Sequence, residues 1–323
     1  MLGNQILVIR GGAIGDFILT LPALRALRQR FPQTRLEVLG YPHIAQLAVA
    51  GGWAHAVRSI EARALAGFFA RGGTLDPTLQ DYFASFAIII SYLYDPDGVF
   101  QENVARCSKA QFIVGPHRPV ETAHLHATRV FLKPLERLAI FDAETVPALP
   151  VTPAPLPLQA EDHPLGHRSG REGPQWLAVH PGSGSERKNW PEPLWARFLG
   201  DLSEQTDWRL LVVGGEAEGD RLERLTRCLP PGRIRVVRSQ PLPDLARQLS
   251  ACRAFVGHDS GISHLAAALG VTSLVLWGDT VEAIWRPAGK HVTVLRGPQG
   301  LPSITVAEVM VWLGTMTSPA GSL

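Results

Sequence analysis

Residues 254–277 read AFVGHDSGISHLAAALGVTSLVLW and give the clearest indication of the fold class. Two short apolar runs, 254–256 and 273–277, flank a segment, 265–269, that has the composition of a buried helix and stops before Gly270. A strand, a helix and another strand in direct succession are typical of a parallel sheet, whose neighbouring strands need a crossover between them. The stretch therefore predicts an α/β protein with a parallel sheet.

The same alternation of short apolar runs and helical patterns continues along the whole chain, which predicts doubly wound parallel sheets covered by helices. Strands are expected near 5–10, 35–39, 56–59, 86–91, 111–115, 175–180, 209–213, 234–237, 253–257, 272–277 and 291–295. Helices are expected near 21–30, 43–50, 120–132, 192–204, 217–228, 243–250, 261–269 and 305–313.

The chain divides into two similar halves. Residues 146–175 contain seven prolines and no helical or strand periodicity, so they read as an extended linker. The segments ILVIRGGAIGD (6–16) and LLVVGGEAEGD (210–220) match at six of eleven positions, and each runs from an apolar strand into a glycine turn. We expect two Rossmann-like domains, 1–155 and 156–323, that meet across a cleft at the carboxyl ends of their strands.

The composition excludes several classes of protein. Of the 323 residues, 46% are hydrophobic and 19% charged, and the formal net charge is +2, without the excess of basic residues typical of a nucleic-acid binder. The three cysteines form no C-x-x-C pair, which favours reduced thiols in a cytoplasmic protein. The apolar run 6–9 is too short for a secretory signal, and no stretch approaches the roughly 20 apolar residues of a membrane span.

Several well-known motifs are incomplete in this sequence. The dinucleotide fingerprint G-x-G-x-x-G fails in both halves, because Arg10 replaces its first glycine in one half and Glu216 its second in the other. A serine-hydrolase elbow, G-x-S-x-G, would need glycines two residues before and after Ser260, where His258 and Ile262 stand. The phosphate loop is absent, and no pair of histidines has the spacing of a metal site, so we expect neither a metal nor a cofactor.

Two segments at the ends of expected strands have the features of anion-binding sites. The turn VHPGSGSERKNWP, 179–191, is rich in glycine and serine and contains Lys188, one of four lysines in the chain. The backbone amides of such a turn form an anion site, and a lysine ammonium suits phosphate oxygens. At the start of the helix after 258, the free amides and the dipole favour a second negative group, which Ser260 and His264 can contact and Gly261 allows to approach closely. Together they predict a diphosphate site.

Asp16 follows the first glycine turn and is the candidate for acid–base chemistry. Thr20, directly before Leu21 and Pro22, is expected to cap the helix at 21–30 and so to leave Asp16 free of a structural task. A carboxylate at the end of a strand can accept a proton from a substrate hydroxyl within hydrogen-bond distance.

The segments ILVIRGGAIGDFILTLPALRALRQRFP, HPGSGSERKNWP and VGHDSGISHLAAALGVTSLVLWG together resemble glycosyltransferase family 9, the ADP-heptose lipopolysaccharide heptosyltransferases. The resemblance extends in order and spacing over the whole chain. It implies the GT-B architecture, in which two Rossmann-like domains face a central cleft. The N-terminal domain would bind the acceptor and the C-terminal domain the nucleotide sugar.

The resemblance also implies roles for individual residues. Asp16 would be the general base of an inverting single displacement, and Lys188 would contact the donor and stabilise the charge that develops on the leaving diphosphate. The remaining donor-binding residues implied by the family motifs are Ser183, Ser185, Glu216, Asp259, Ser260, Gly261 and His264. No metal would be needed. The implied partners are a nucleotide sugar and a lipid-linked saccharide at the cytoplasmic face of the inner membrane.

Acceptor recognition is not encoded in a clear motif. His126, Arg129, Lys133 and Arg137 are spaced as a basic stripe, but Pro134 interrupts the helix, so we expect a solvated face there.

Three other functions stay open from the sequence. The first is a transferase of the same fold that uses a different nucleotide sugar, because motifs that hold a diphosphate do not define the sugar. A nicotinamide-dependent oxidoreductase is disfavoured by the two failed fingerprints. A non-catalytic nucleotide-sugar binding protein is disfavoured because both Asp16 and Lys188 are present.

Overall fold

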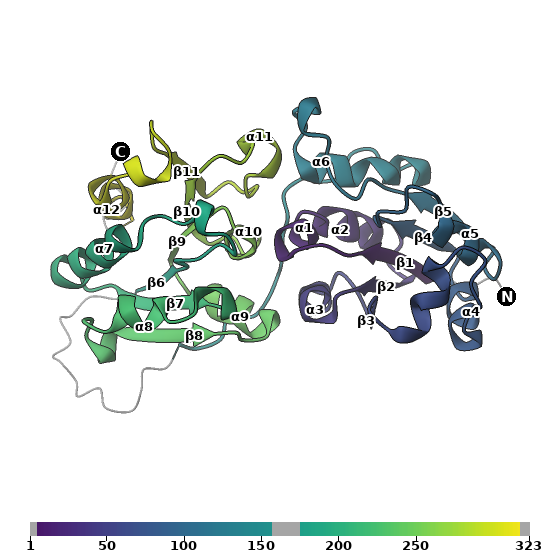
Figure 1. Ribbon diagram of the computed structural model, residues 1–323, viewed down its shortest axis with the longest axis horizontal. Helices are drawn as coiled ribbons and strands as arrows, with labels where there is room; N and C mark the ends of the chain where they lie inside the picture. The colour runs from purple at the N-terminus through teal and green to yellow at the C-terminus, as the bar shows by residue number, and fades with distance from the viewer. Residues whose placement is uncertain (1–4, 157–174, 317–323) are drawn as a thin grey trace. The chain divides into compact units, whose positions relative to one another are not determined.

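The computed structural model describes residues 5–156 and 175–316, which form two compact units. Unit 1 comprises Met1–Pro150 with Ala283–Trp285, and unit 2 comprises Val151–Glu282 with Arg286–Leu323. Each unit contains its own parallel sheet (Figure 1). Each unit also has its own hydrophobic core. The predicted fold class, two α/β units with parallel sheets, is confirmed.

The sheet of unit 1 has five parallel strands in the order β3-β2-β1-β4-β5. Its central strand is buried along almost its whole length, as expected for a parallel strand covered on both faces. The strands are β1 (Gln5–Arg10), β2 (Arg35–Gly40), β3 (Ala56–Ser59), β4 (Ile88–Ser91) and β5 (Gln111–Val114). The helices are α1 (Ile14–Ile18), α2 (Leu21–Arg30), α3 (Pro42–Ala50), α4 (Pro77–Ala84), α5 (Val99–Ala105) and α6 (Ala127–Leu132), with 3-10 turns η1 (Arg63–Phe69), η2 (Glu121–Ala123) and η3 (Lys133–Leu138).

The sheet of unit 2 has six parallel strands in the order β11-β10-β9-β6-β7-β8. The strands are β6 (Trp176–Val179), β7 (Arg209–Gly214), β8 (Ile234–Arg238), β9 (Ala254–His258), β10 (Thr272–Trp277) and β11 (Val292–Arg296). The helices are α7 (Glu192–Gln205), α8 (Arg221–Thr226), α9 (Leu242–Leu249), α10 (Gly261–Ala268) and α12 (Val306–Gly314). The short helix α11 (Glu282–Trp285) begins at the last residue of this part of unit 2, and its other residues belong to unit 1. The 3-10 turns are η4 (Glu186–Lys188), η5 (Glu216–Glu218), η6 (Pro231–Arg233) and η7 (Leu301–Ser303). Helix α7 packs against α8 and α12.

The cores of the two units differ in composition. In unit 1 the side of the sheet near α4 and α5 is filled by phenylalanines, with Phe68, Phe83 and Phe100 in mutual ring contact. In unit 2 the indoles of Trp190 and Trp195 pack at a steep angle, with ring centroids 5.4 Å apart. Each of these buried rings removes a large apolar area from water and so stabilises the core of its unit.

All eleven expected strands are present within two residues of their expected bounds, but some expected helices differ. The single helix expected at 120–132 is wrong: only α6 and the short turn η2 form there. His124 adopts the left-handed conformation, with φ of 50°, which ends η2 and prevents one continuous helix. The helix expected at 217–228 is shortened to α8, because a 3-10 turn precedes it.

The linker expected at 146–175 is only partly described, since 157–174 lie outside the described residues. Its beginning packs on unit 1. The indole of Trp53 donates to the carbonyl of Ala148 at 2.7 Å, and Leu149 is buried against Gly51. Residues 148–149 are therefore part of the first unit's structure.

Candidate functional site

The candidate site of unit 2 lies where the strand order reverses. From β6 the chain continues to β7 and β8 on one side, and then returns to β9 and β10 on the other. In doubly wound sheets, ligands bind at this switch point, outside the carboxyl ends of the strands. The segments that follow β6, β9 and β10 carry Lys188, Asp259 and Thr280, so three neighbouring strands deliver polar side chains to one edge of the sheet.

These three side chains are in direct contact. The Lys188 ammonium lies 2.6 Å from Asp259 Oδ2, and the Thr280 hydroxyl donates to the same oxygen at 2.6 Å. Asp259 is almost fully buried, whereas the Lys188 side chain is 34% exposed. The carboxylate thus fixes the lysine in place, while its remaining N–H donors stay accessible to an anionic ligand.

Thr280 was not predicted from the sequence. It lies 21 residues after Asp259 and belongs to no recognised motif. The available signal was its position shortly after a predicted strand, the same position that singled out Lys188 and Asp259.

The start of α10 brings the other predicted motif residues together. Ser260 is the N-cap, and its hydroxyl accepts a hydrogen bond from the amide of Ser263 at 3.4 Å. The same hydroxyl lies 3.2 Å from Nδ1 of His180, so this cap is tied to the segment after β6. Gly261 is the first helical residue, and His264 is buried one turn into the helix.

His258 fixes the loop that carries Lys188. Its ring is fully buried, and Nε2 accepts hydrogen bonds from the amide of Trp190 at 2.8 Å and the indole of Trp195 at 3.2 Å. Its Nδ1 lies 3.2 Å from the carbonyl of Gly182, which requires the proton on that nitrogen. Burial lowers the pKa of His258 to about 3, so the ring is neutral and holds both ends of the segment 182–190. This role was not predicted.

Ser183 and Ser185 lie in that loop, but their hydroxyls differ in environment. The Ser183 hydroxyl lies 2.7 Å from Asn189 Oδ1 and 2.9 Å from the carbonyl of Ser185, so it bonds within the loop. Ser185 precedes η4 and makes no side-chain capping hydrogen bond. The structure therefore places both residues beside Lys188 and gives Ser183 a structural contact.

The predicted ribose-binding acid, Glu216, is exposed in the turn η5 after β7. Two residues later Glu218 is buried, accepts a hydrogen bond from the amide of Gly215 and lies 3.8 Å from Nε2 of His180. Burial lowers the pKa of His180 to about 4, so this contact joins a neutral imidazole to a carboxylate. Among the described residues no hydrogen bond or ion pair joins Glu216 to the Lys188 group.

Asp16 lies in unit 1, at the equivalent switch point between β1 and β4. It is the third residue of the short helix α1, and its Oδ2 accepts a hydrogen bond from the amide of Ala13 at 3.1 Å. Thr20 occupies the predicted N-cap position of α2, but the prediction that Asp16 is free of a structural task is wrong. Thr20 makes no side-chain capping bond and instead donates to the Asp16 carbonyl at 2.8 Å. The side chain of Asp16 is nevertheless 30% exposed.

Arg10, the last residue of β1, lies next to Asp16. Its guanidinium is buried, lies 3.7 Å from Asp16 Oδ1 and donates to the carbonyl of His117 at 2.9 Å. It also lies over the ring of Phe131, 4.4 Å from the centroid. Burial lowers the pKa of Arg10, and the nearby Asp16 carboxylate opposes that shift. Arg10 thus holds a buried positive charge next to the exposed carboxylate of Asp16.

Two further observations describe the chain as a whole. Within residues 5–156 and 175–316, no group of three or more His, Cys, Asp or Glu side chains is arranged to hold a metal ion. None of the helices in this part of the chain combines the length and apolar character needed to cross a membrane.

Comparison with protein families identifies one match. Residues 143–308, slightly more than half of the chain, match the model of glycosyltransferase family 9 (heptosyltransferase). Lipopolysaccharide heptosyltransferase 1 of Pseudomonas aeruginosa is 34% identical over 130 residues, which is 39% of this chain and 36% of that protein. Lipopolysaccharide heptosyltransferase 1 of Escherichia coli is 30% identical over 112 residues, 35% of this chain and 34% of that protein. The matched region thus spans about a third of these relatives' length.

Solved structures resemble the chain over almost its whole length. The E. coli heptosyltransferase WaaC with ADP covers 97% of this chain and 100% of its own, with a TM-score of 0.72 and 18% identity. A family 9 glycosyl transferase from Veillonella parvula covers 97% of this chain and 96% of its own, with a TM-score of 0.74 and 17% identity. These likenesses confirm the predicted GT-B fold class.

Proposed function

Because the chain belongs to glycosyltransferase family 9, we propose that it is an inverting transferase that moves heptose from ADP-heptose to a lipopolysaccharide-core acceptor. The proposal is carried by one observation: Lys188, Asp259 and Thr280 meet at the switch point of the unit 2 sheet. An accessible ammonium beside a helix start is suited to the diphosphate of a nucleotide sugar. ADP is the ligand of the similar structure of WaaC.

In the proposed mechanism, Asp16 accepts the proton of an acceptor hydroxyl. The hydroxyl oxygen forms a bond to the anomeric carbon while the bond from that carbon to the diphosphate breaks, and ADP leaves from the opposite face. Lys188 and the amides at the start of α10 stabilise the negative charge that develops on the diphosphate. Unit 1 would thus supply the base and bind the acceptor, and unit 2 would bind the donor.

The proposed acceptor is a saccharide linked to a lipid, so we place the reaction at the cytoplasmic surface of the inner membrane. The motifs of unit 2 hold the diphosphate and leave the sugar and the base of the donor open. A transferase that uses another nucleotide sugar is the alternative with the same fold and mechanism.

The test is thermal unfolding of the full chain with ADP, UDP, GDP or NADH. A ligand at about 100 times its Kd stabilises the folded state by about 2.7 kcal/mol, enough to separate the candidates. We expect stabilisation by ADP. Selective stabilisation by UDP or GDP would retain the transferase and discard ADP-heptose, and stabilisation by NADH alone would overturn the proposal.

A matched pair of variants locates the ligand. Lys188→Met removes the ammonium held by Asp259, so we expect it to abolish stabilisation by ADP. Lys290→Met removes an exposed lysine elsewhere in unit 2 and should leave the ADP effect unchanged. Equal ADP stabilisation of both variants would place the nucleotide away from Lys188.

A further inference from the structure

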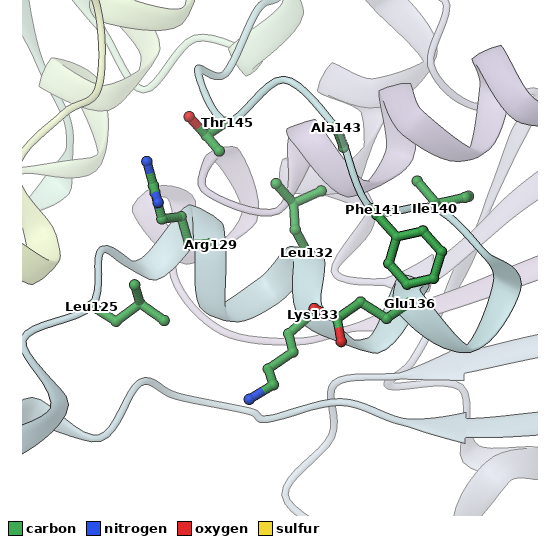
Figure 2. Close-up of a pocket in the computed structure, with 9 residues that line it drawn as sticks. All are labelled: Leu125, Arg129, Leu132, Lys133, Glu136, Ile140, Phe141, Ala143 and Thr145. Carbon is green, nitrogen blue, oxygen red and sulfur yellow. The ribbon is translucent and has the colours of Figure 1, made fainter.

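Unit 1 contains a cavity that the proposed chemistry does not use. It has a volume of about 350 Å³ and lies between α6, η3 and the segment that follows them (Figure 2). Its lining combines apolar and charged side chains: Leu125, Arg129, Leu132, Lys133, Glu136, Ile140, Phe141, Ala143 and Thr145.

The inner face of α6 and η3 is anchored in the core of unit 1. Phe131 and Leu135 are fully buried, and the hydroxyl of Tyr92 donates to the carbonyl of Phe131 at 2.6 Å. The outward positions therefore have a fixed direction. Arg129 and Lys133, four residues apart, project from the opposite side, where both are exposed.

The positive charges on this outer face are only partly offset by acidic side chains. Within the parts of the chain that the structure describes, no ion pair involves Arg129, Lys133 or Arg137. Glu144, which follows the cavity residue Ala143, is instead paired with Arg25 at 3.6 Å. Glu136 also lines the cavity and offsets part of the charge.

The cavity is bordered by apolar side chains that are exposed. Phe141 is 71% exposed and Leu125 38% exposed, and both contribute to the lining. Figure 2 shows the ring of Phe141 on the segment that returns past α6 and η3. A large aromatic side chain in water beside unpaired cations is typical of a surface that meets the boundary between lipid headgroups and acyl chains.

We propose that this cavity and its border form a docking site for an anionic lipid surface. Arg129 and Lys133 each contact the phosphate of an anionic phospholipid headgroup, and Phe141 and Leu125 insert into the apolar part of the bilayer. The inference rests on the proposed function in one respect, namely that a transferase acting on a lipid-linked acceptor works at a membrane. Exposed cations are attracted to anionic lipid, and the exposed apolar side chains favour a bilayer over a soluble anion.

The test is co-sedimentation of the full chain with vesicles of phosphatidylcholine alone, or of equal parts of phosphatidylcholine and phosphatidylglycerol. We expect binding only to the vesicles that contain phosphatidylglycerol. The double variant Arg129→Gln, Lys133→Gln should weaken that binding by roughly 25-fold, about fivefold for each cation. Glu136→Gln should strengthen it, because it removes a negative charge from the cavity.

Matched controls separate a specific site from general charge or hydrophobicity. Arg71→Gln with Lys109→Gln removes two exposed cations elsewhere in unit 1 and should leave vesicle binding unchanged. Phe141→Ser should reduce binding several-fold, whereas Val311→Ser, which changes a side chain that is 72% exposed on α12, should not.

Three outcomes would overturn the proposal: no binding to the anionic vesicles, binding that survives the Arg129 and Lys133 double variant, or an equal loss in the Arg71 and Lys109 control pair. Displacement by inorganic phosphate, but not by chloride at equal ionic strength, would assign the cavity to a soluble anion. ADP stabilisation of the same variants provides the independent readout. It should be unchanged in all of them, and its absence in the wild type would refute the proposed donor without affecting the vesicle result.

Discussion

Asp16 combines a structural contact with an exposed carboxylate, and the two can be separated by substitution. In Asp16→Asn the amide oxygen can still accept the hydrogen bond from Ala13, but the side chain no longer accepts a proton. We expect the rate of glycosyl transfer to fall by about 10²–10⁴-fold, the usual contribution of a general base, while ADP affinity is unchanged. Transfer by the purified variant and calorimetric titration with ADP measure the two effects.

Asp76→Asn is the matched control for that substitution. Asp76 also accepts a hydrogen bond from the start of a helix, the amide of Leu79 at 3.1 Å, and it lies in the same unit. This variant should transfer sugar at the wild-type rate. If Asp16→Asn retains more than about a tenth of the wild-type rate, the general base is a different group.

The buried histidines of unit 2 predict a specific dependence of stability on pH. Their folded-state pKa values, about 4 for His180 and about 3 for His258, lie below the ordinary value of 6.5. In the unfolded chain both rings take up a proton as the pH falls below about 6.5, whereas the folded chain keeps them neutral until about pH 4. As the pH falls from about 6.5 to about 4, the free energy of unfolding should therefore decrease by about 1.4 kcal/mol per pH unit for each ring.

Urea denaturation of the full chain at about pH 7 and about pH 5 measures this decrease in the free energy of unfolding. His180→Asn should roughly halve the slope because one buried ring is removed. His124→Asn changes an exposed histidine in unit 1 and should leave the slope unchanged. A free energy of unfolding that is constant between the two pH values would show that neither ring is kept neutral by the fold.

Among the elements, the turn after β6 needs a glycine at position 182 for lack of space, since the backbone there does not adopt a left-handed conformation. A Cβ at Gly182 would overlap Glu218 Oε1, so any side chain there must displace the buried glutamate. We expect Gly182→Ala to lower the free energy of unfolding by about 1–3 kcal/mol, the usual cost of overpacking. Chemical denaturation measures the change.

Two further variants test the cause. Gly200→Ala lies inside α7 with no atom within 4 Å of the added carbon, and it should raise stability by up to about 1 kcal/mol. Replacing Glu218 by Ala in the Gly182→Ala background should recover part of the loss. If the double variant is no more stable than Gly182→Ala, the clash with Glu218 is not the cause.

The elements also show what the sequence could and could not predict. Every strand was predictable because buried parallel strands are short apolar runs bounded by turns, as in 254–258 and 272–277. The helix α1 was missed because five residues after a glycine turn show no periodicity. The helix α4 was also missed, although Asp76 before Pro77 is a typical N-terminal signal.

For the candidate site, sequence motifs predicted Lys188 because it lies in a turn rich in glycine and serine, and the start of α10 because it follows a strand closely. Thr280 and His258 required the structure. Their partners, Asp259 and Trp190, are 21 and 68 residues away along the chain, and such distances in sequence carry no local pattern.

For the whole molecule, the separate sheets and cores predict that the two units unfold in separate steps. The aromatic core of unit 1 and the tryptophan-rich core of unit 2 share no residue. Chains with several domains commonly deviate from a single two-state transition. We expect two heat-capacity peaks in scanning calorimetry, of which ADP raises only the one that belongs to unit 2.

Gly182→Ala assigns the peaks, because it should lower the same peak that ADP raises. A single peak that shifts as a whole with ADP would show that the units unfold as one cooperative structure.

The distribution of indole side chains has a practical consequence. Six of the eight tryptophans lie in unit 2: Trp176, Trp190, Trp195, Trp208, Trp277 and Trp312. Trp195 lies against the ring of His258, with centroids 5.4 Å apart, and Trp190 ends the loop that carries Lys188. Ultraviolet emission from the unlabelled protein thus originates mainly in one unit, close to the loop proposed to bind the nucleotide. Intrinsic tryptophan fluorescence can therefore follow movements of that loop in real time, without an attached dye.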